Sequence, residues 1–123
     1  MKQGEIWLIN LAPTVGAEMN KTRPAVIVND DRLGKLPLKI IVPVTDWKEH
    51  YSVAPWMRAI TPSQENGLIK KSSIDCFQIR SVSKNRLIKR IGNITFSEMF
   101  QVQEGIAKVI GYDTQSTETN YSR

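Results

Sequence analysis

The sequence has too few cysteines and histidines for a crosslinked or zinc-stabilised fold. Cys76 is its one cysteine and His50 its one histidine. A single cysteine forms no disulfide within the chain, and a structural zinc site typically needs about four cysteine or histidine ligands. The carboxylates are also not spaced like the ligands of a metal-dependent nuclease. We therefore expect no disulfide scaffold, no metal site and no cofactor.

Long apolar runs are missing as well. A helix that spans a bilayer needs roughly 18 to 20 consecutive apolar residues, and no stretch of the chain approaches that length. The first residues, MKQGE, lead directly into a strand-like segment. This pattern predicts a cytoplasmic protein that does not associate with membranes. With 123 residues, of which 41% are hydrophobic, the chain is long enough for one core and one domain.

Acidic residues are scarce between Lys70 and Arg90. Asp75 is the one carboxylate in that stretch. The basic residues there are Lys70, Lys71, Arg80, Lys84, Arg86, Lys89 and Arg90. The whole chain carries a formal charge of +5. A polyanionic partner such as a nucleic acid fits this charge, and so does an ordinary solvated rim of lysines.

Short runs rich in β-formers, separated by turns, make up most of the chain. The runs predict strands near residues 5–11, 25–28, 38–44, 56–61, 72–82 and 90–94. Near the C-terminus the period changes, and apolar residues recur every three or four positions at Met99, Val102, Ile106, Val109 and Ile110. This spacing predicts an amphipathic helix.

Both ends of that helix are marked in the sequence. Thr95 and Glu98 have the spacing of a capping box, and Gly111 supplies a left-handed stop. Several short strands followed by one helix predict a mainly β fold, a small antiparallel barrel with a C-terminal α-helix. We expect a single domain over residues 1–112 and a polar, disordered tail over residues 113–123.

The loop between Pro13 and Pro24 gathers several polar groups just before a buried strand. Pro24 biases Arg23 toward an extended backbone, so the point at which the Arg23 side chain leaves the backbone is well defined. A planar fork in that position suits a phosphate. Alternatively, Arg23 ties the loop to the sheet through Glu18 or a carbonyl group. The residues alone favour neither interpretation.

A succession of motifs resembles the toxin family named for MazF, PemK and Kid. The motifs are GEIW (4–7), PTVGAE (13–18), TRPAVIV (22–28), VPVT (42–45), and FQIRSV (77–82) ahead of KNRL (84–87). They occur in order along nearly the whole chain. The resemblance implies a homodimeric SH3-like barrel that cuts single-stranded RNA at specific sequences. It also implies inhibition by an acidic antitoxin and DNA binding by the toxin–antitoxin complex.

The resemblance also assigns roles to individual residues. Arg23 and Thr45 match the catalytic positions, and Gln78 matches a glutamine that lies along the RNA groove. Glu18 matches a position near the substrate. We expect the base to be either Glu18 or a positioned water, because an arginine such as Arg23 stays protonated in an ordinary environment. Phe77 stands where relatives often carry an acidic residue. We expect this ring to alter base preference by stacking on a base.

Other side chains near these motifs are expected to contact RNA. They are Lys21, Trp47, Asp75 and Arg80. In an uninterrupted strand, Asp75 and Phe77 share one face while Gln78 and Arg80 share the other, and either face fits the groove. Trp47 and Trp56 border a loop and suit either base stacking or packing, whereas Trp7 is expected in the core. His50 lies outside every matched motif and is expected to be an ordinary loop histidine.

Cleavage without a metal requires the RNA 2′-hydroxyl to attack the adjacent phosphorus. The site must orient that hydroxyl, stabilise negative charge and protonate the leaving oxygen. Arg23 suits charge stabilisation, and Thr45 suits positioning. Two other functions remain open. A related barrel in another toxin lineage binds DNA gyrase and cuts nothing, and an RNA-binding barrel without catalysis would use the same groove.

Overall fold

A computed structural model describes residues 1–18 and 21–112. The strands of this part are β1 (Glu5–Asn10), β2 (Thr22–Ile27), β3 (Leu38–Asp46), β4 (Met57–Ile60), β5 (Ser72–Asp75), β6 (Arg80–Ser83) and β7 (Leu87–Asn93). Four short 3-10 helices lie between strands: η1 (Asp31–Leu33), η2 (Glu49–Val53), η3 (Cys76–Gln78) and η4 (Lys84–Arg86). One α-helix, α1 (Phe96–Ile110), follows the last strand. The predicted tail at residues 113–123 lies outside the described residues.

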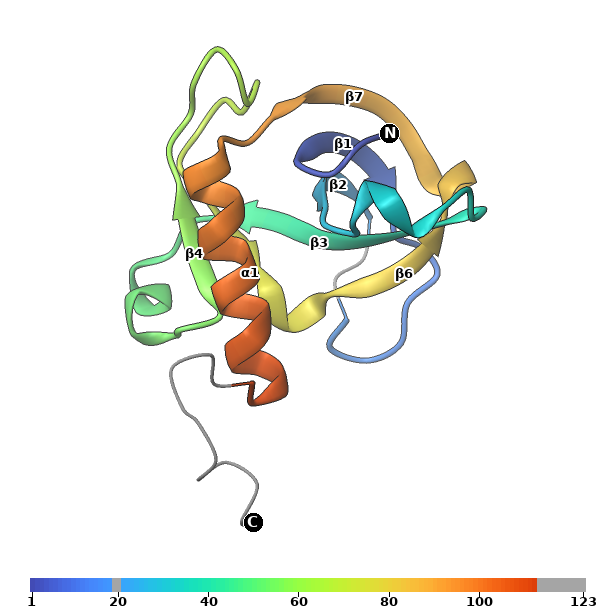
Figure 1. Ribbon diagram of the computed structural model, residues 1–123. Coiled ribbons are helices and arrows are strands. Elements are labelled where there is room, and N and C mark those ends of the chain that lie inside the picture. Colours follow the sequence, from blue (N-terminus) through green and yellow to red (C-terminus); the bar gives the residue numbers. More distant parts are fainter. Residues whose placement is uncertain (19–20, 113–123) are drawn as a thin grey trace, which may run out of the picture.

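The long strand β3 connects two groups of antiparallel strands. Its first half pairs with β2 on one side and with β6 on the other, and β2 continues through β1 to β7. Its second half pairs with β5, which pairs with β4. The sheet curls so that β6 and β7 approach each other at the turn that joins them (Figure 1). The prediction of a mainly β, barrel-like fold with one C-terminal helix is confirmed.

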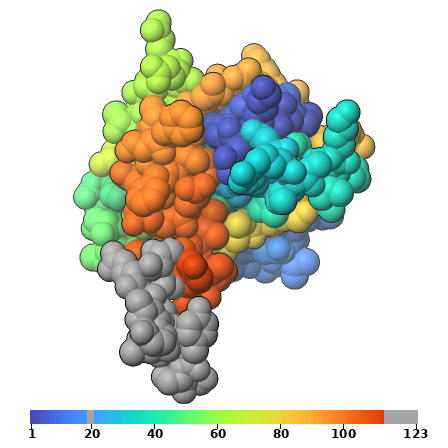
Figure 2. Space-filling view, in the orientation of Figure 1, coloured from blue at the N-terminus to red at the C-terminus, as the bar shows by residue number. Residues whose placement is uncertain are grey.

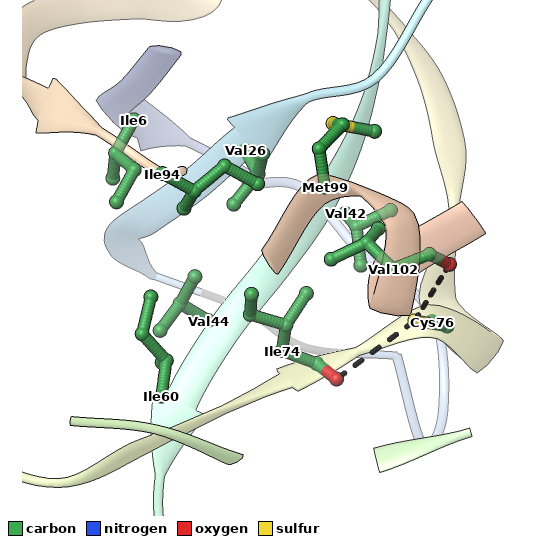
Figure 3. Close-up of a cluster of buried hydrophobic side chains, with 10 residues drawn as sticks. All are labelled: Ile6, Val26, Val42, Val44, Ile60, Ile74, Cys76, Ile94, Met99 and Val102. Atoms are coloured by element: carbon green, nitrogen blue, oxygen red, sulfur yellow. Dashed lines mark hydrogen bonds between the residues drawn. The ribbon is translucent and has the colours of Figure 1, made fainter. Parts of the chain in front are cut away.

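Two hydrophobic clusters lie on opposite faces of β1, β2 and β3. The cluster on the helix side contains Ile6, Val26, Val42, Val44, Ile60, Ile74, Cys76, Ile94, Met99 and Val102 (Figure 3). The cluster inside the curled sheet contains Ile9, Leu11, Ala25, Ile27, Ile41, Val82 and Leu87, and Trp7 packs against it as predicted. Because β2 and β3 are covered on both faces, their sequences are continuously apolar rather than alternating.

The helix α1 begins and ends where its sequence signals predict. Thr95 and Glu98 form the capping box, and Gly111 adopts a left-handed conformation at the C-terminal end. Met99 and Val102 are buried in the helix-side cluster (Figure 3). Gly105 faces η3, and a Cβ atom there would lie 2.7 Å from Cys76 Sγ. The glycine therefore permits the close approach of α1 to η3, although glycine is a poor helix former.

The prediction of one continuous strand over residues 72–82 is wrong. β5 and β6 both pair with β3, but η3 interrupts them. Between the pairs Ile74↔Val44 and Arg80↔Ile41, this side of the ladder contains three more residues than β3 does. The extra residues form a bulge that coincides with Pro43.

The position of the bulge follows from the hydrogen-bonding pattern of β3. The backbone of Ile40 bonds toward the β2 side, since its N–H donates to Asn29 Oδ1 and its carbonyl accepts from Val28. Alternation then directs the backbone of Pro43 toward β5 and β6. Proline has no N–H to donate there. The ladder is therefore interrupted at Pro43, and the partner strand leaves it to form η3.

Candidate active site

A pocket of about 400 Å³ opens where β3 and η3 meet the first loop, which is the segment that joins β1 to β2. It is lined by Leu11, Ala17, Glu18, Pro43, Phe77, Gln78, Ile79 and Arg80. Four predicted site residues therefore line one cavity: Glu18 from the first loop, and Phe77, Gln78 and Arg80 from the later segment of η3 and β6. The bulge at η3 makes this convergence possible, because it directs Phe77 and Gln78 away from the regular strand path.

Asp75 is not in the pocket lining, but its carboxylate accepts hydrogen bonds from the residues of η3. Its side chain is buried, accepts a hydrogen bond from the Phe77 N–H at 3.1 Å and lies 3.4 Å from Gln78 Nε2. Burial raises the pKa of Asp75, although these hydrogen bonds act in the opposite direction. The prediction that Asp75 and Phe77 share one face is wrong, since Phe77 is 62% exposed while Asp75 is only 4% exposed.

The exposed ring of Phe77 is held by an aromatic neighbour. Trp56 contacts it edge-on, with the ring centroids 5.8 Å apart and the planes at 63°. Trp56 is itself half-buried and packs against the helix-side cluster. Phe77 therefore presents a partly free face at the pocket from a fixed position.

The first loop carries Glu18 to the pocket rim in a defined turn. Glu18 Oε1 accepts a hydrogen bond from the Val15 N–H at 2.6 Å, and the Glu18 N–H donates to the Val15 carbonyl. The ends of the loop are joined by a hydrogen bond from the Leu11 N–H to the Lys21 carbonyl at 3.2 Å. Lys21 is exposed and has a φ of 78°, which is unusual for a residue other than glycine.

Arg23 and Thr45 lie on neighbouring strands and share one face of the sheet. Ala25 of β2 is paired with Pro43 of β3. Arg23 lies two residues before Ala25 and Thr45 lies two residues after Pro43, so alternation directs both to the face that carries Ala25 and Pro43. Pro43 lines the pocket, and both Arg23 and Thr45 are half-buried. Neither Arg23 nor Thr45 is among the residues that line the pocket, but strand alternation places both on the sheet face of Pro43, which does line it.

Trp47 is not in the pocket lining. Its ring is covered on one side by the Lys71 ammonium group, 4.6 Å from the ring centroid, and Tyr51 contacts it edge-on at 6.0 Å. The indole Nε1 donates to Glu49 at 3.3 Å. The exposed His50 packs against Tyr51 and not in the pocket.

Several basic side chains between residues 70 and 90 make contacts within the protein. Lys70 forms a 2.9 Å salt bridge with Asp46. Arg80 Nη1 lies 3.4 Å from the Leu11 carbonyl, and Arg86 donates to the carbonyl groups of Asn10 and Ala12. From the sequence, this stretch is interpreted either as positive charge for a nucleic acid or as a solvated rim, and Arg80 is expected to contact RNA. The contacts of Arg80 and Arg86 were missed because they join residues 69 to 76 positions apart.

The described part of the chain contains no candidate metal site and no candidate membrane-spanning helix. Within residues 1–18 and 21–112, no three histidine, cysteine, aspartate or glutamate side chains are grouped so that they could hold a metal ion. No helix in this part has the length and apolar character needed to cross a membrane.

Comparisons with known proteins agree with this architecture. The profile of the family described as PemK-like, MazF-like toxin of type II toxin-antitoxin system matches residues 2–110. The endoribonuclease MazF9 of Mycobacterium tuberculosis is 32% identical over 112 residues, which cover 86% of this chain and 92% of the relative. The endoribonuclease MazF of Staphylococcus saprophyticus is 30% identical over 114 residues, covering 93% of this chain and 94% of that protein.

A solved structure has the same fold. The crystal structure of MazF from Deinococcus radiodurans matches with a TM-score of 0.75 at 18% identity, over 90% of this chain and 96% of that one. The family match and the sequence relatives confirm the resemblance drawn from the motifs. The chain belongs to the family of PemK-like, MazF-like toxins of type II toxin–antitoxin systems.

Proposed function

We propose that this toxin is a sequence-specific endoribonuclease that cuts single-stranded RNA without a metal ion. The observation that carries the proposal is the convergence of Glu18, Phe77, Gln78 and Arg80 on one pocket. Arg23 and Thr45 belong to the same face of the sheet. Relatives over most of the chain length are named endoribonucleases, which supports the same activity here.

In the proposed reaction, the 2′-hydroxyl of the RNA attacks the adjacent phosphorus. Arg23 stabilises the negative charge that develops on the phosphate oxygens, and Thr45 holds a non-bridging oxygen or the attacking hydroxyl. Glu18 accepts the hydroxyl proton. One of its oxygens is oriented by the Val15 N–H, and a carboxylate keeps further lone pairs for the proton. The leaving 5′-oxygen takes a proton from water, so the products are a 2′,3′-cyclic phosphate and a 5′-hydroxyl.

The pocket is proposed to bind the RNA next to the cut. Its volume of about 400 Å³ is enough for a nucleobase. Phe77 stacks on that base, and the Gln78 amide offers both a donor and an acceptor to its edge. Lys21 and Arg80 attract the phosphates on either side. Trp47 lies outside the pocket lining, so we assign it to a nucleotide farther along the strand.

An acidic antitoxin is proposed to compete with RNA for the pocket and for the basic residues Lys21, Arg23 and Arg80. A mycobacterial endoribonuclease solved in complex with its cognate antitoxin supports a partner of this kind, since it matches this chain with a TM-score of 0.71. An acidic, flexible peptide is drawn to the same charges that attract RNA. Its association rate is therefore expected to fall steeply as salt is added, while its dissociation rate changes less.

A second copy of the chain is proposed to cover an exposed apolar patch. The patch consists of Leu33, Leu36, Leu38 and Ile40, which are 65%, 59%, 48% and 38% exposed. Leu38 and Ile40 lie on the same face of β3 as the buried Val42 and Val44, but beyond the cover of α1. Figure 2 shows segment 31–40 projecting on the face of the molecule that also carries α1. An apolar patch of this kind marks an interface.

The test of the proposed function is cleavage of single-stranded RNA in excess EDTA. We expect cutting by the wild-type protein and a loss of about 10² to 10³ in rate for Arg23→Ala, the usual effect of removing a preorganised charge-stabilising group. Lys89→Ala, an exposed change of the same charge, is the control. Near-normal cutting by Arg23→Ala would overturn the assignment. Intact RNA together with inhibited supercoiling by DNA gyrase would favour the gyrase-binding alternative, and retention of uncut RNA would favour the non-catalytic one.

A further inference from the structure

Two arginines hold the first loop where it leaves the sheet. Arg86 Nη1 donates to the carbonyl of Asn10 at 3.2 Å and also to that of Ala12. Arg80 Nη1 lies 3.4 Å from the carbonyl between them, that of Leu11. The carbonyl groups of residues 10–12, the loop neck, therefore face the guanidinium groups of Arg80 at the start of β6 and Arg86 at the end of η4. The contact joins segments far apart in sequence that lie side by side in Figure 1.

The Arg86 side chain donates hydrogen bonds to β1 and the first loop just beyond the point where the backbone pairing of β1 with β7 ends. The pairing between β1 and β7 ends at Ile9↔Leu87. The next residue on the β7 side is Arg86, and its side chain supplies the donors that the sheet no longer offers to Asn10 and Ala12. A planar guanidinium has several N–H groups in a rigid fork, so one side chain can serve two carbonyls.

The backbone that carries Arg86 is itself well fixed. Ser83 caps η4 through its hydroxyl, which accepts from the Asn85 N–H at 3.3 Å. The Lys84 N–H donates to the Pro37 carbonyl at 3.0 Å. Leu87, which follows Arg86, is 8% exposed and packs in the second hydrophobic cluster. The guanidinium is thus attached to a rigid base and not to a mobile turn.

The loop neck determines where the site residues stand. The loop carries Ala17 and Glu18 to the pocket, and its return strand β2 begins with the segment that contains Arg23. Arg86 is absent from the pocket lining, whereas Arg80 is part of it. We propose that Arg86 is a positioning residue, which fixes the loop neck and thereby places Glu18 for the reaction without contacting RNA.

This inference rests on the proposed ribonuclease function and is tested by comparing Arg86→Ala with Lys84→Ala. Lys84 lies on the same short helix, is exposed, and its removal changes the charge by the same amount. Two quantities are measured: kcat for RNA cleavage, and the affinity for an RNA carrying 2′-deoxyribose at the cut site. We expect Arg86→Ala to lower kcat by about 10- to 100-fold, because a misplacement of about 1 Å has effects of that order. Its affinity should fall no more than that of Lys84→Ala.

A second readout follows the loop directly and does not depend on catalysis. The amides of Leu11, Ala12, Val15 and Glu18 all donate hydrogen bonds within the loop. Arg86→Ala should speed hydrogen exchange at these amides, and Lys84→Ala should not. If the wild-type protein cuts no RNA, the proposed function fails, while the exchange comparison still decides whether Arg86 holds the loop.

Three results would overturn the inference. They are a kcat equal to that of Lys84→Ala, unchanged exchange in the loop, or a loss of RNA affinity as large as the loss in kcat/KM. The last would make Arg86 a phosphate-binding residue. If Arg86→Ala does not fold, Arg86→Lys serves instead, since it keeps the charge and the stem but not the fork. It should show the same changes in weaker form, and wild-type values for both readouts would again overturn the proposal.

Discussion

Replacing Gly105 with alanine should destabilise the protein although alanine is the better helix former. On helix propensity alone, the substitution favours folding by about 0.8 to 1.0 kcal/mol. The added Cβ, however, would lie 2.7 Å from Cys76 Sγ, 3.1 Å from Arg58 Nε and 3.3 Å from Cys76 Cβ. Ordinary contacts begin near 3.4 Å. Either α1 or η3 must therefore move by several tenths of an ångström.

Overpacking of this kind typically costs about 1 to 3 kcal/mol. The gain in propensity offsets part of this cost, so we expect a net loss of up to about 2 kcal/mol in the free energy of unfolding. For a domain of this size, that corresponds to a fall in Tm of several degrees. Because η3 also carries Phe77 and Gln78 into the pocket, RNA cleavage should fall as well.

The assay is thermal unfolding of Gly105→Ala, with Gln101→Ala on the exposed side of α1 as the matched control. The control should leave Tm close to that of the wild type. Cys76→Ala removes the sulfur that the new methyl group meets, so the double variant should be destabilised less than the two single changes together. A raised Tm for Gly105→Ala, or purely additive effects, would refute the reasoning.

Three further outcomes are expected. Thr45→Val keeps the β-branched shape and removes the hydroxyl, so it should lose most cleavage activity at an unchanged Tm, and wild-type cutting would make Thr45 merely structural. Ile40→Lys places a charge in the exposed apolar patch and should shift the sedimentation of the protein toward that of a monomer, whereas an unaltered dimer would show that the interface lies elsewhere. Burial raises the pKa of Glu5, but hydrogen bonds from the Trp7 indole and the Lys2 backbone, with nearby cations, bring it below its usual 4.5. The stabilisation from Glu5 is therefore present at neutral pH and is lost as pH falls below about 4.5, so Glu5→Gln should flatten the acid side of the Tm profile.

Local signals in the sequence predicted the elements that depend on local interactions. The helix α1 begins at its capping box and ends at Gly111, because both signals act within a few residues. The apolar runs of β2 and β3 were recognisable as buried strands, since a strand covered on both faces is continuously apolar. The family motifs added the expectation of a site near Arg23 and Thr45.

The bulge at η3 was not predictable in the same way. Residues 72–82 have the composition of a strand, and the interruption depends on Pro43, which lies in a different strand that pairs with them. Proline within an otherwise regular strand was the available signal, but its effect on a partner requires knowing the register. The contacts of Arg86 with the loop neck were hidden for the same reason, because they depend on the pairing of β1 with β7.

The most direct test of the proposed chemistry is a single substitution in the RNA. The wild-type protein is incubated in excess EDTA with two RNAs that differ only at the cut site, one with ribose and one with 2′-deoxyribose at that nucleotide. If the 2′-hydroxyl is the nucleophile, the first RNA is cut to leave a 2′,3′-cyclic phosphate and a 5′-hydroxyl, and the second stays intact at that position. Cutting at the deoxyribose position would mean that water or a metal-bound hydroxide attacks the phosphorus, which would contradict the proposed mechanism.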